Sequence, residues 1–103
     1  MSLIKTITTL IIFCLFITTL AYAQTAEDFF NFGNAKYKLK DYRGAIQDYN
    51  KAIELNPKLA SAYLGRGLAK ILLGQKDDGC LDLSKAGELG EASAYETIKE
   101  LCN

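Results

Sequence analysis

Residues 26–59 read AEDFFNFGNAKYKLKDYRGAIQDYNKAIELNPKL, and this stretch decides the fold. Apolar residues recur in it at intervals of three and four, which places them on one stripe of a helix that a neighbouring element must cover. One such run is Tyr42, Ala45, Ile46, Tyr49, Ala52 and Ile53. Asp41 is suited to cap the helix that contains this run, and Pro57 stands just past its end, where proline interrupts no helical hydrogen bond. We therefore expect two helices in this stretch.

Similar start and stop signals continue on both sides of it. Thr25 followed by Asp28 opens the first helix, and Gly74 and Gly90 stand where two later helices should end, because glycine accepts the left-handed conformation of a C-terminal cap. Ser93 begins an S-x-x-E capping box that should start a last short helix. No segment alternates with a period of two, so we expect no strands. The expected helices are 26–39, 42–55, 60–73, 76–89 and 94–102.

A second copy of the pattern follows at a distance of 34 residues. Residues 45–51 read AIQDYNK and residues 79–85 read GCLDLSK, so that Asp48 is aligned with Asp82 and Ile46 with Cys80. Short connections make successive helices antiparallel. A period of this length is typical of stacked helix pairs rather than of a closed bundle.

Residues 26–59 resemble a complete tetratricopeptide repeat. The resemblance is carried by Phe29, Phe32, Gly33, Tyr37, Ala45, Tyr49, Ala52 and Pro57. Residues 60–93 resemble a second, weaker copy, in which Tyr63, Gly67, Leu83 and Ala86 agree with the pattern and Gly79 and Glu91 depart from it.

The resemblance implies an all-α fold. In such a fold, antiparallel helix-turn-helix pairs stack as a short right-handed α-solenoid, and residues 94–103 would form a C-terminal capping helix. Gly33 and Gly67 would then lie where the two helices of each pair approach most closely.

Residues 1–23 read MSLIKTITTLIIFCLFITTLAYA, with one basic residue, an uncharged apolar run and a small-x-small end. This is the layout of a secretory signal peptide, so we expect cleavage after Ala23 and a single domain over 24–103 in the periplasm or the medium. The alternative is an uncleaved membrane anchor, although the apolar run is short for a span. Cys14 lies inside that run after bulky Phe13, so no lipid anchor is implied.

Loss of the leader also changes the charge and the cysteine count. The full chain has twelve basic and twelve acidic residues, and removal of Lys5 leaves eleven basic ones. Nothing resembles the clustered basic surface that nucleic acid demands. Cys80 and Cys102 remain, and an even number of cysteines in a small exported domain favours a disulfide, here between the start of the fourth helix and the end of the fifth. The alternative is two buried thiols.

Catalysis is not expected. The chain has no histidine, so the usual general base is absent and a zinc site has poor ligands; we expect no metal and no cofactor. Asp77, Asp78 and Asp82 stand at the start of an expected helix, where carboxylates interact favourably with the helix dipole. The stretch GRGLAK at 65–70 imitates a phosphate loop but lies inside an expected helix.

The resemblance implies a concave groove, lined by the first helix of each pair, that holds a peptide or a partner's helix. The residues carried over to this groove are Phe30, Asn34, Tyr37, Lys38, Leu64, Leu68, Ile71 and Leu72. Packing of Leu68 and Leu72 against the next helix is the alternative for those two. The family's clamp for a terminal carboxylate is mostly missing, because Phe30 and Gly65 replace its lysine and asparagine.

The expected partner is therefore another protein of unknown identity. Two other functions stay open at this point. The chain could associate with itself through its end that carries Phe29, Phe30 and Phe32, or it could bind a small molecule or glycan stacked on Tyr37 and Phe30.

Overall fold

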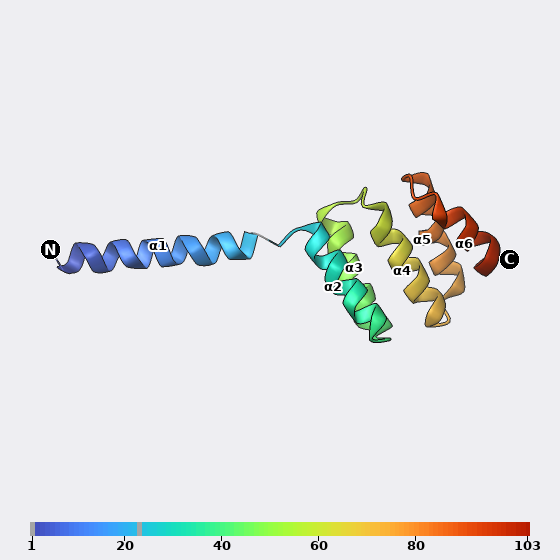
Figure 1. Cartoon of the computed structure of the whole chain (residues 1–103), viewed down its shortest axis with the longest axis horizontal. Coiled ribbons are helices and arrows are strands. Elements are labelled where there is room, and N and C mark those ends of the chain that lie inside the picture. Colours follow the sequence, from blue (N-terminus) through green and yellow to red (C-terminus); the bar gives the residue numbers. More distant parts are fainter. Residues whose placement is uncertain (1, 23) are drawn as a thin grey trace.

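The computed structural model describes residues 2–22 and 24–103, and in these ranges every regular element is a helix. The helices are α1 (Ser2–Tyr22), α2 (Ala26–Lys38), α3 (Tyr42–Leu55), α4 (Ala60–Leu72), α5 (Lys76–Glu88) and α6 (Ser93–Leu101), as Figure 1 shows. The all-α prediction is confirmed, and the five expected helices lie within one residue of their expected bounds. Helix α1, which covers most of the expected leader, was not among them.

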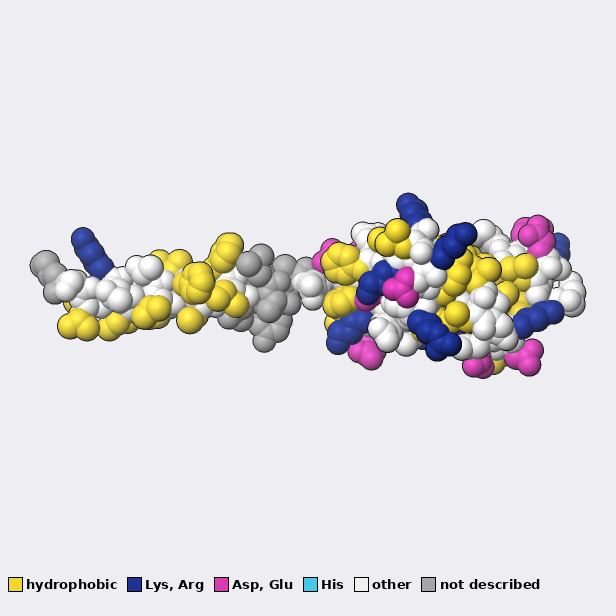
Figure 2. Space-filling model, turned by 90° about the horizontal axis from the view of Figure 1, so that it is seen from below, with side chains coloured by type: hydrophobic (Ala, Val, Ile, Leu, Met, Phe, Trp, Pro, Cys, Tyr) yellow, Lys and Arg dark blue, Asp and Glu magenta, His cyan; other side chains and the backbone are white. Residues whose placement is uncertain are grey.

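Helix α1 projects away from the other helices (Figure 1). Its described large apolar side chains, from Leu3 to Ile17, are each 50 to 74% exposed. Its sequence contains a single charged residue, Lys5, and Figure 2 shows a cationic side chain on this helix. Within the described residues, none of the helices combines the length and the apolar character that crossing a bilayer requires.

Helices α2 to α6 pack in sequence order. Helix α2 packs on α3 and α4 on α5, α3 joins the two pairs by packing on α4, and α6 packs on α5. The residues at these contacts are mostly small and are no more than 1% exposed. They are Ala45, Tyr49, Ala52, Ala62, Ala69, Leu83, Ala86 and Ala94. The result is a short α-solenoid of two helix pairs with a further helix at its C-terminal end (Figure 1).

The expected helix ends are largely confirmed. The hydroxyl oxygen of Thr25 accepts a hydrogen bond from the Asp28 amide, and the Asp28 carboxylate accepts one from the Thr25 amide, which completes a capping box. Asp41 accepts a hydrogen bond from the amide of Gly44 at 3.0 Å. Gly74 and Gly90 follow their helices with φ of +85° and +107°, in the left-handed region that favours glycine.

The expected capping box at Ser93 is wrong. Helix α6 begins at Ser93 itself, and its capping position is Ala92, whose dihedral angles are already helical. A side chain inside the first turn cannot cap that turn, so the Ser93 hydroxyl donates instead to the carboxylate of Glu91 at 2.7 Å.

The two helix pairs use glycine in different ways. A Cβ atom on Gly67 would lie 2.7 Å from the carbonyl oxygen of Gly79, so the backbones of α4 and α5 touch there, as expected. At Gly33 a side chain of the paired helix closes the contact instead, since a Cβ there would meet the ring of Tyr49 on α3 at 2.7 Å. Gly65 on α4 leaves room for the same ring. Tyr49 therefore fills the space between α2 and α4 that small residues leave open.

Candidate functional site

The α2 half of the expected groove is organised around Tyr49. Phe30, Asn34 and Tyr37 are half-buried on α2, and Lys38 is exposed at the end of that helix. The ring centroids of Phe30 and Tyr49 are 5.9 Å apart, and the hydroxyl of Tyr49 donates a hydrogen bond of 2.6 Å to the amide oxygen of Asn34. The Asn34 side chain is thereby oriented by the core beneath it.

Burial controls the protonation of this tyrosine. It raises the pKa of Tyr49 from its ordinary value of 10.0 to about 12, and Tyr37 adds a smaller contribution in the same direction. Burial also raises the pKa of Tyr37, whose ring packs edge-on against Tyr42 at 5.3 Å. Tyr49 is therefore a neutral hydroxyl that donates to Asn34 throughout the physiological pH range.

The α4 half of the groove is aliphatic. Leu64, Leu68 and Ile71 are half-buried, and Leu72 is 53% exposed. These residues repeat the spacing of their counterparts on α2 (i, i+4, i+7, i+8), so each helix presents one stripe. We call the eight residues together the α2–α4 face. No enclosed pocket is found in the described part of the chain.

Asp82 has a role that the sequence pattern missed. The residue is 7% exposed, and its carboxylate accepts two hydrogen bonds from Arg66, at 2.8 and 2.7 Å, while the ammonium of Lys70 lies 2.9 Å away. A hydrogen bond from Arg66 also reaches Asn50 on α3 at 2.9 Å. The interpretation of Asp82 as a dipole-favoured carboxylate at a helix start is therefore wrong, because it neutralises two cations of α4 inside the stack.

The hydrogen bond with Asp82 is the largest cause that raises the pKa of Arg66. Asp77 and Asp78 do lie in the first turn of α5, as expected. Among the described residues, no three His, Cys, Asp or Glu side chains are grouped so that they could hold a metal ion.

The first helix pair contains a simpler form of this contact. Lys36 and Asp48 lie 34 residues before Lys70 and Asp82, and their charged atoms are 2.9 Å apart. The signal that could have predicted both pairs was present in the sequence, because lysine and aspartate recur together at the repeat distance. Both pairs tie the two helices of a repeat together and leave the α2–α4 face to the other side chains.

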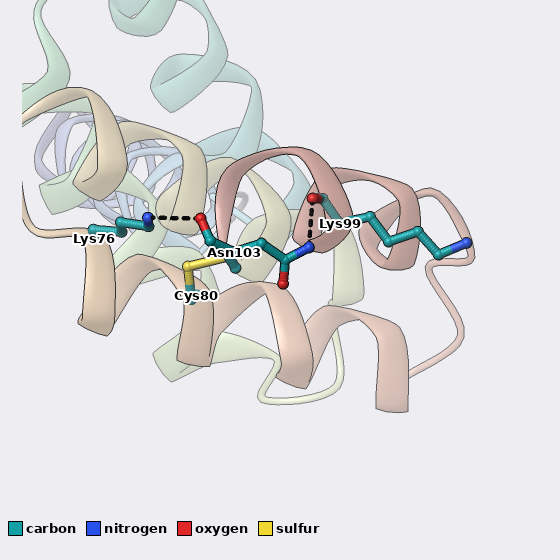
Figure 3. Close-up of a disulfide and its surroundings, with 5 residues drawn as sticks. Lys76, Cys80, Lys99 and Asn103 are labelled. Atoms are coloured by element: carbon teal, nitrogen blue, oxygen red, sulfur yellow. Dashed lines mark hydrogen bonds between the residues drawn. A yellow bond between two sulfur atoms is a disulfide. The ribbon is translucent and has the colours of Figure 1, made fainter.

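A disulfide joins Cys80 on α5 to Cys102 at the end of α6, with Cα atoms 5.9 Å apart. Figure 3 shows two hydrogen bonds beside it: Lys76 donates to the carbonyl of Asn103, and the Asn103 amide donates to the carbonyl of Lys99. A Cβ atom on Gly87 of α5 would meet the Tyr95 ring at 2.8 Å. Helix α6 is thus held against α5 both by the disulfide and by close packing.

Comparison with known proteins gives the family. The model of the TPR repeat family matches residues 33–74, from the first helix of the first pair to the end of the first helix of the second. Over 67 residues the chain is 39% identical to the protein STIP1 homolog of Dictyostelium discoideum; the match covers 65% of this chain and 12% of that protein.

Two further relatives have different names and lengths. The chain is 37% identical over 82 residues to the protein SGT1 homolog of Oryza sativa subsp. japonica, covering 78% of this chain and 22% of the relative. It is also 37% identical over 71 residues to a UDP-N-acetylglucosamine--peptide N-acetylglucosaminyltransferase of Giardia intestinalis, covering 69% of this chain and 5% of the relative. The chain thus spans less than a quarter of each of these relatives, and what they share with it is the repeat. The helix pairs, the family match and these similarities together show that the chain is a tetratricopeptide repeat protein.

Proposed function

We propose that this protein–protein interaction module is exported and that it binds a peptide or a partner's helix along the α2–α4 face. The observation that carries the proposal is the pair of matching stripes on α2 and α4. Their apolar members are only half-buried and Leu72 is 53% exposed, so a ligand that covered them would remove apolar surface from water.

The chemistry of the face favours a mainly apolar ligand segment. Phe30 and Tyr37 offer aromatic surface on α2, and Leu68 and Leu72 offer aliphatic surface on α4. The exposed ammonium of Lys38 could pair with a carboxylate of the ligand, which would fix its direction. Such a ligand would gain affinity from burial and orientation from one charged contact.

Export is supported by two independent features. Residues 1–23 have the layout of a signal peptide, and the Cys80–Cys102 disulfide is of a kind that persists in oxidising compartments. Both features support the periplasm or the medium as the proposed location. An intact mass of the protein recovered from a cell-envelope fraction tests this, because cleavage after Ala23 gives a chain that begins at Gln24. A mass that includes residues 1–23 would instead favour an N-terminal membrane anchor.

The proposed activity is binding without catalysis. The relatives that match these repeats have different names, and one of them is a transferase. The repeat is therefore a module found within larger proteins of different kinds. In this chain the buried carboxylate Asp82 is already occupied by Arg66 and Lys70.

The experiment that tests the face is a crosslinking pull-down from the native envelope fraction with Leu72→Glu. Leu72 is exposed, so the substitution should leave the fold intact while placing a carboxylate on the apolar face. The matched control is Leu81→Glu, since Leu81 is 69% exposed on α5 and lies outside the face. We expect the wild type and the control to capture the same partner and Leu72→Glu to lose it. Equal capture by both variants would refute binding at this face.

A further inference from the structure

The two repeats differ in what covers the first helix of each. On α4, Ala62 and Ala69 are fully buried, since α3 packs against that helix. The residues 34 positions earlier on α2 are Asp28, which is half-buried, and Ala35, which is exposed. The stripe is completed by Phe32, 48% exposed, and Leu39, 80% exposed. We call Asp28, Phe32, Ala35 and Leu39 the outer α2 face; their spacing (i, i+4, i+7, i+11) puts them on one side of the helix.

This face is not built for another repeat of the same kind. On α4, Gly65 leaves room for the ring of Tyr49 and Arg66 donates to Asn50, so both residues fit α3. The corresponding residues on α2 are Asn31 and Phe32. A side chain at 31 would occupy the space of such a ring, and Phe32 has no donor for such an amide. The opposite end of the stack is also closed, because α6 covers α5 and is bonded to it by the disulfide.

The outer α2 face is complementary to itself. Helix α2 is acidic in its first turn (Glu27, Asp28) and basic in its last (Lys36, Lys38). Phe32 is the central residue of this 13-residue helix, so a two-fold axis through it would place Asp28 of one chain opposite Lys36 of the other. Antiparallel pairing also brings opposite ends of the two helix dipoles together.

Apolar contact would complete such a pair. The rings of Phe29 and Phe32 meet edge-on at 6.1 Å, which supports the Phe32 ring from within its own helix. The two Phe32 rings would meet at the axis, and Ala35 would allow close approach of the helices on either side. Asp28 and Lys36 already have partners in their own chain, but a carboxylate and an ammonium can each take more than one.

We propose that the outer α2 face binds a second copy of this chain, with the two α2 helices antiparallel about a two-fold axis near Phe32. One pair of 13-residue helices is a small interface, so the dimer is weak and forms at high local concentration. This association is separate from ligand binding on the α2–α4 face, which lies on a different side of α2.

The test uses the full chain with a benzoyl-phenylalanine photo-crosslinker in place of Phe32, expressed in bacterial cells and irradiated there. We expect a covalent homodimer in which position 32 of one chain is joined to a peptide within 26–40 of the other. The matched control carries the same crosslinker in place of Leu81, an exposed residue of α5, and should give no homodimer.

A second substitution tests the chemistry of the face. Leu39→Glu, added to the crosslinker chain, should reduce the homodimer about tenfold, because antiparallel pairing would place the new carboxylate beside the acidic first turn (Glu27, Asp28) of the other chain's α2. Leu81→Glu in the same background should leave it unchanged. Absence of the homodimer, an equal yield from the position 81 control, or crosslinks only to α6 or to another protein would overturn the proposal.

Discussion

Tyr49 in the first repeat and Leu83 in the second are aligned at the repeat distance and are both fully buried, yet different neighbours hold them. Tyr49 lies between Gly33 and Gly65 and bonds to Asn34. Leu83 lies in a pair whose backbones touch at Gly67 and Gly79. The first repeat thus fills its interior with one large ring, whereas the second closes its helices directly on each other.

The charged contacts differ in the same way. Asp48 pairs with Lys36, whose side chain is 43% exposed, whereas Asp82 pairs with Arg66 and Lys70, whose side chains are each 19% exposed. The second repeat also carries the disulfide to α6. Polar and covalent links are therefore concentrated in the second repeat, whose central residue is Leu83 rather than an aromatic ring.

The comparison between the repeats predicts the largest difference in stability when the two aligned aspartates, Asp82 and Asp48, are replaced. Asp82→Ala should destabilise the fold by about 3 kcal/mol, because it leaves two largely buried cations without their partner. Asp48→Ala should cost about 1 kcal/mol or less, since Lys36 can turn to water. Urea denaturation of both variants measures the difference, and equal losses would contradict the distinction between the repeats.

Reduction of the disulfide should destabilise the fold by a similar or slightly smaller amount, and this loss of stability should be confined to the second repeat and α6. Opening the 22-residue link between Cys80 and Cys102 should lower the free energy of unfolding by about 2–3 kcal/mol. Amide hydrogen exchange should accelerate first in α6, while α2 and α3 keep their protection. Exchange that accelerates evenly from α2 to α6 would show that the disulfide acts on the whole fold.

Replacing the interhelical glycines Gly67 and Gly33 by alanine should also destabilise the two repeats by different amounts. Gly67→Ala places a methyl group against a backbone carbonyl, which only a shift of α5 could relieve, so we expect a loss of about 2 kcal/mol. Gly33→Ala meets the Tyr49 ring, which can move, so we expect about 1 kcal/mol. Thermal midpoints of the two variants give the order, and a larger loss for Gly33→Ala would mean that the ring is held as rigidly as the backbone.

The smallest effect concerns alkaline pH and should occur in the first repeat alone. The pKa of Tyr49 is raised in the folded state to about 12 from an ordinary value of 10.0. The neutral hydroxyl is therefore favoured by folding, and its stabilisation is complete below pH 10 and is lost as the pH rises through 12.

Tyr49→Phe tests this titration. It should cost about 1 kcal/mol at neutral pH through the lost hydrogen bond to Asn34. Denaturation series from pH 8 to about pH 11 should show a smaller alkaline loss of stability for this variant than for the wild type. Parallel curves for the two proteins would mean that Tyr49 does not titrate as described.

The positions of the helices and of most of their ends follow from short patterns in the sequence. The three- and four-residue spacing gave helices within one residue of their observed bounds, and Thr25, Asp41, Gly74 and Gly90 act at the ends assigned to them. The failures are also informative. Ser93 has the spacing of a cap, but the backbone of Ala92 is already helical, so α6 begins one residue earlier than the capping pattern predicts.

The sequence by itself determined the helices, the repeat period and the family, because each of these depends on residues near one another or on a fixed spacing along the chain. Only the tertiary structure decided that Gly33 and Gly65 accommodate one tyrosine ring, that Asn34 is oriented by that ring, and that Asp82 serves two cations of the preceding helix. These contacts join residues 12 to 16 positions apart along the chain, and their geometry is set by the distance between helices. That distance depends on all the small residues between the helices at once, so no local pattern specifies it.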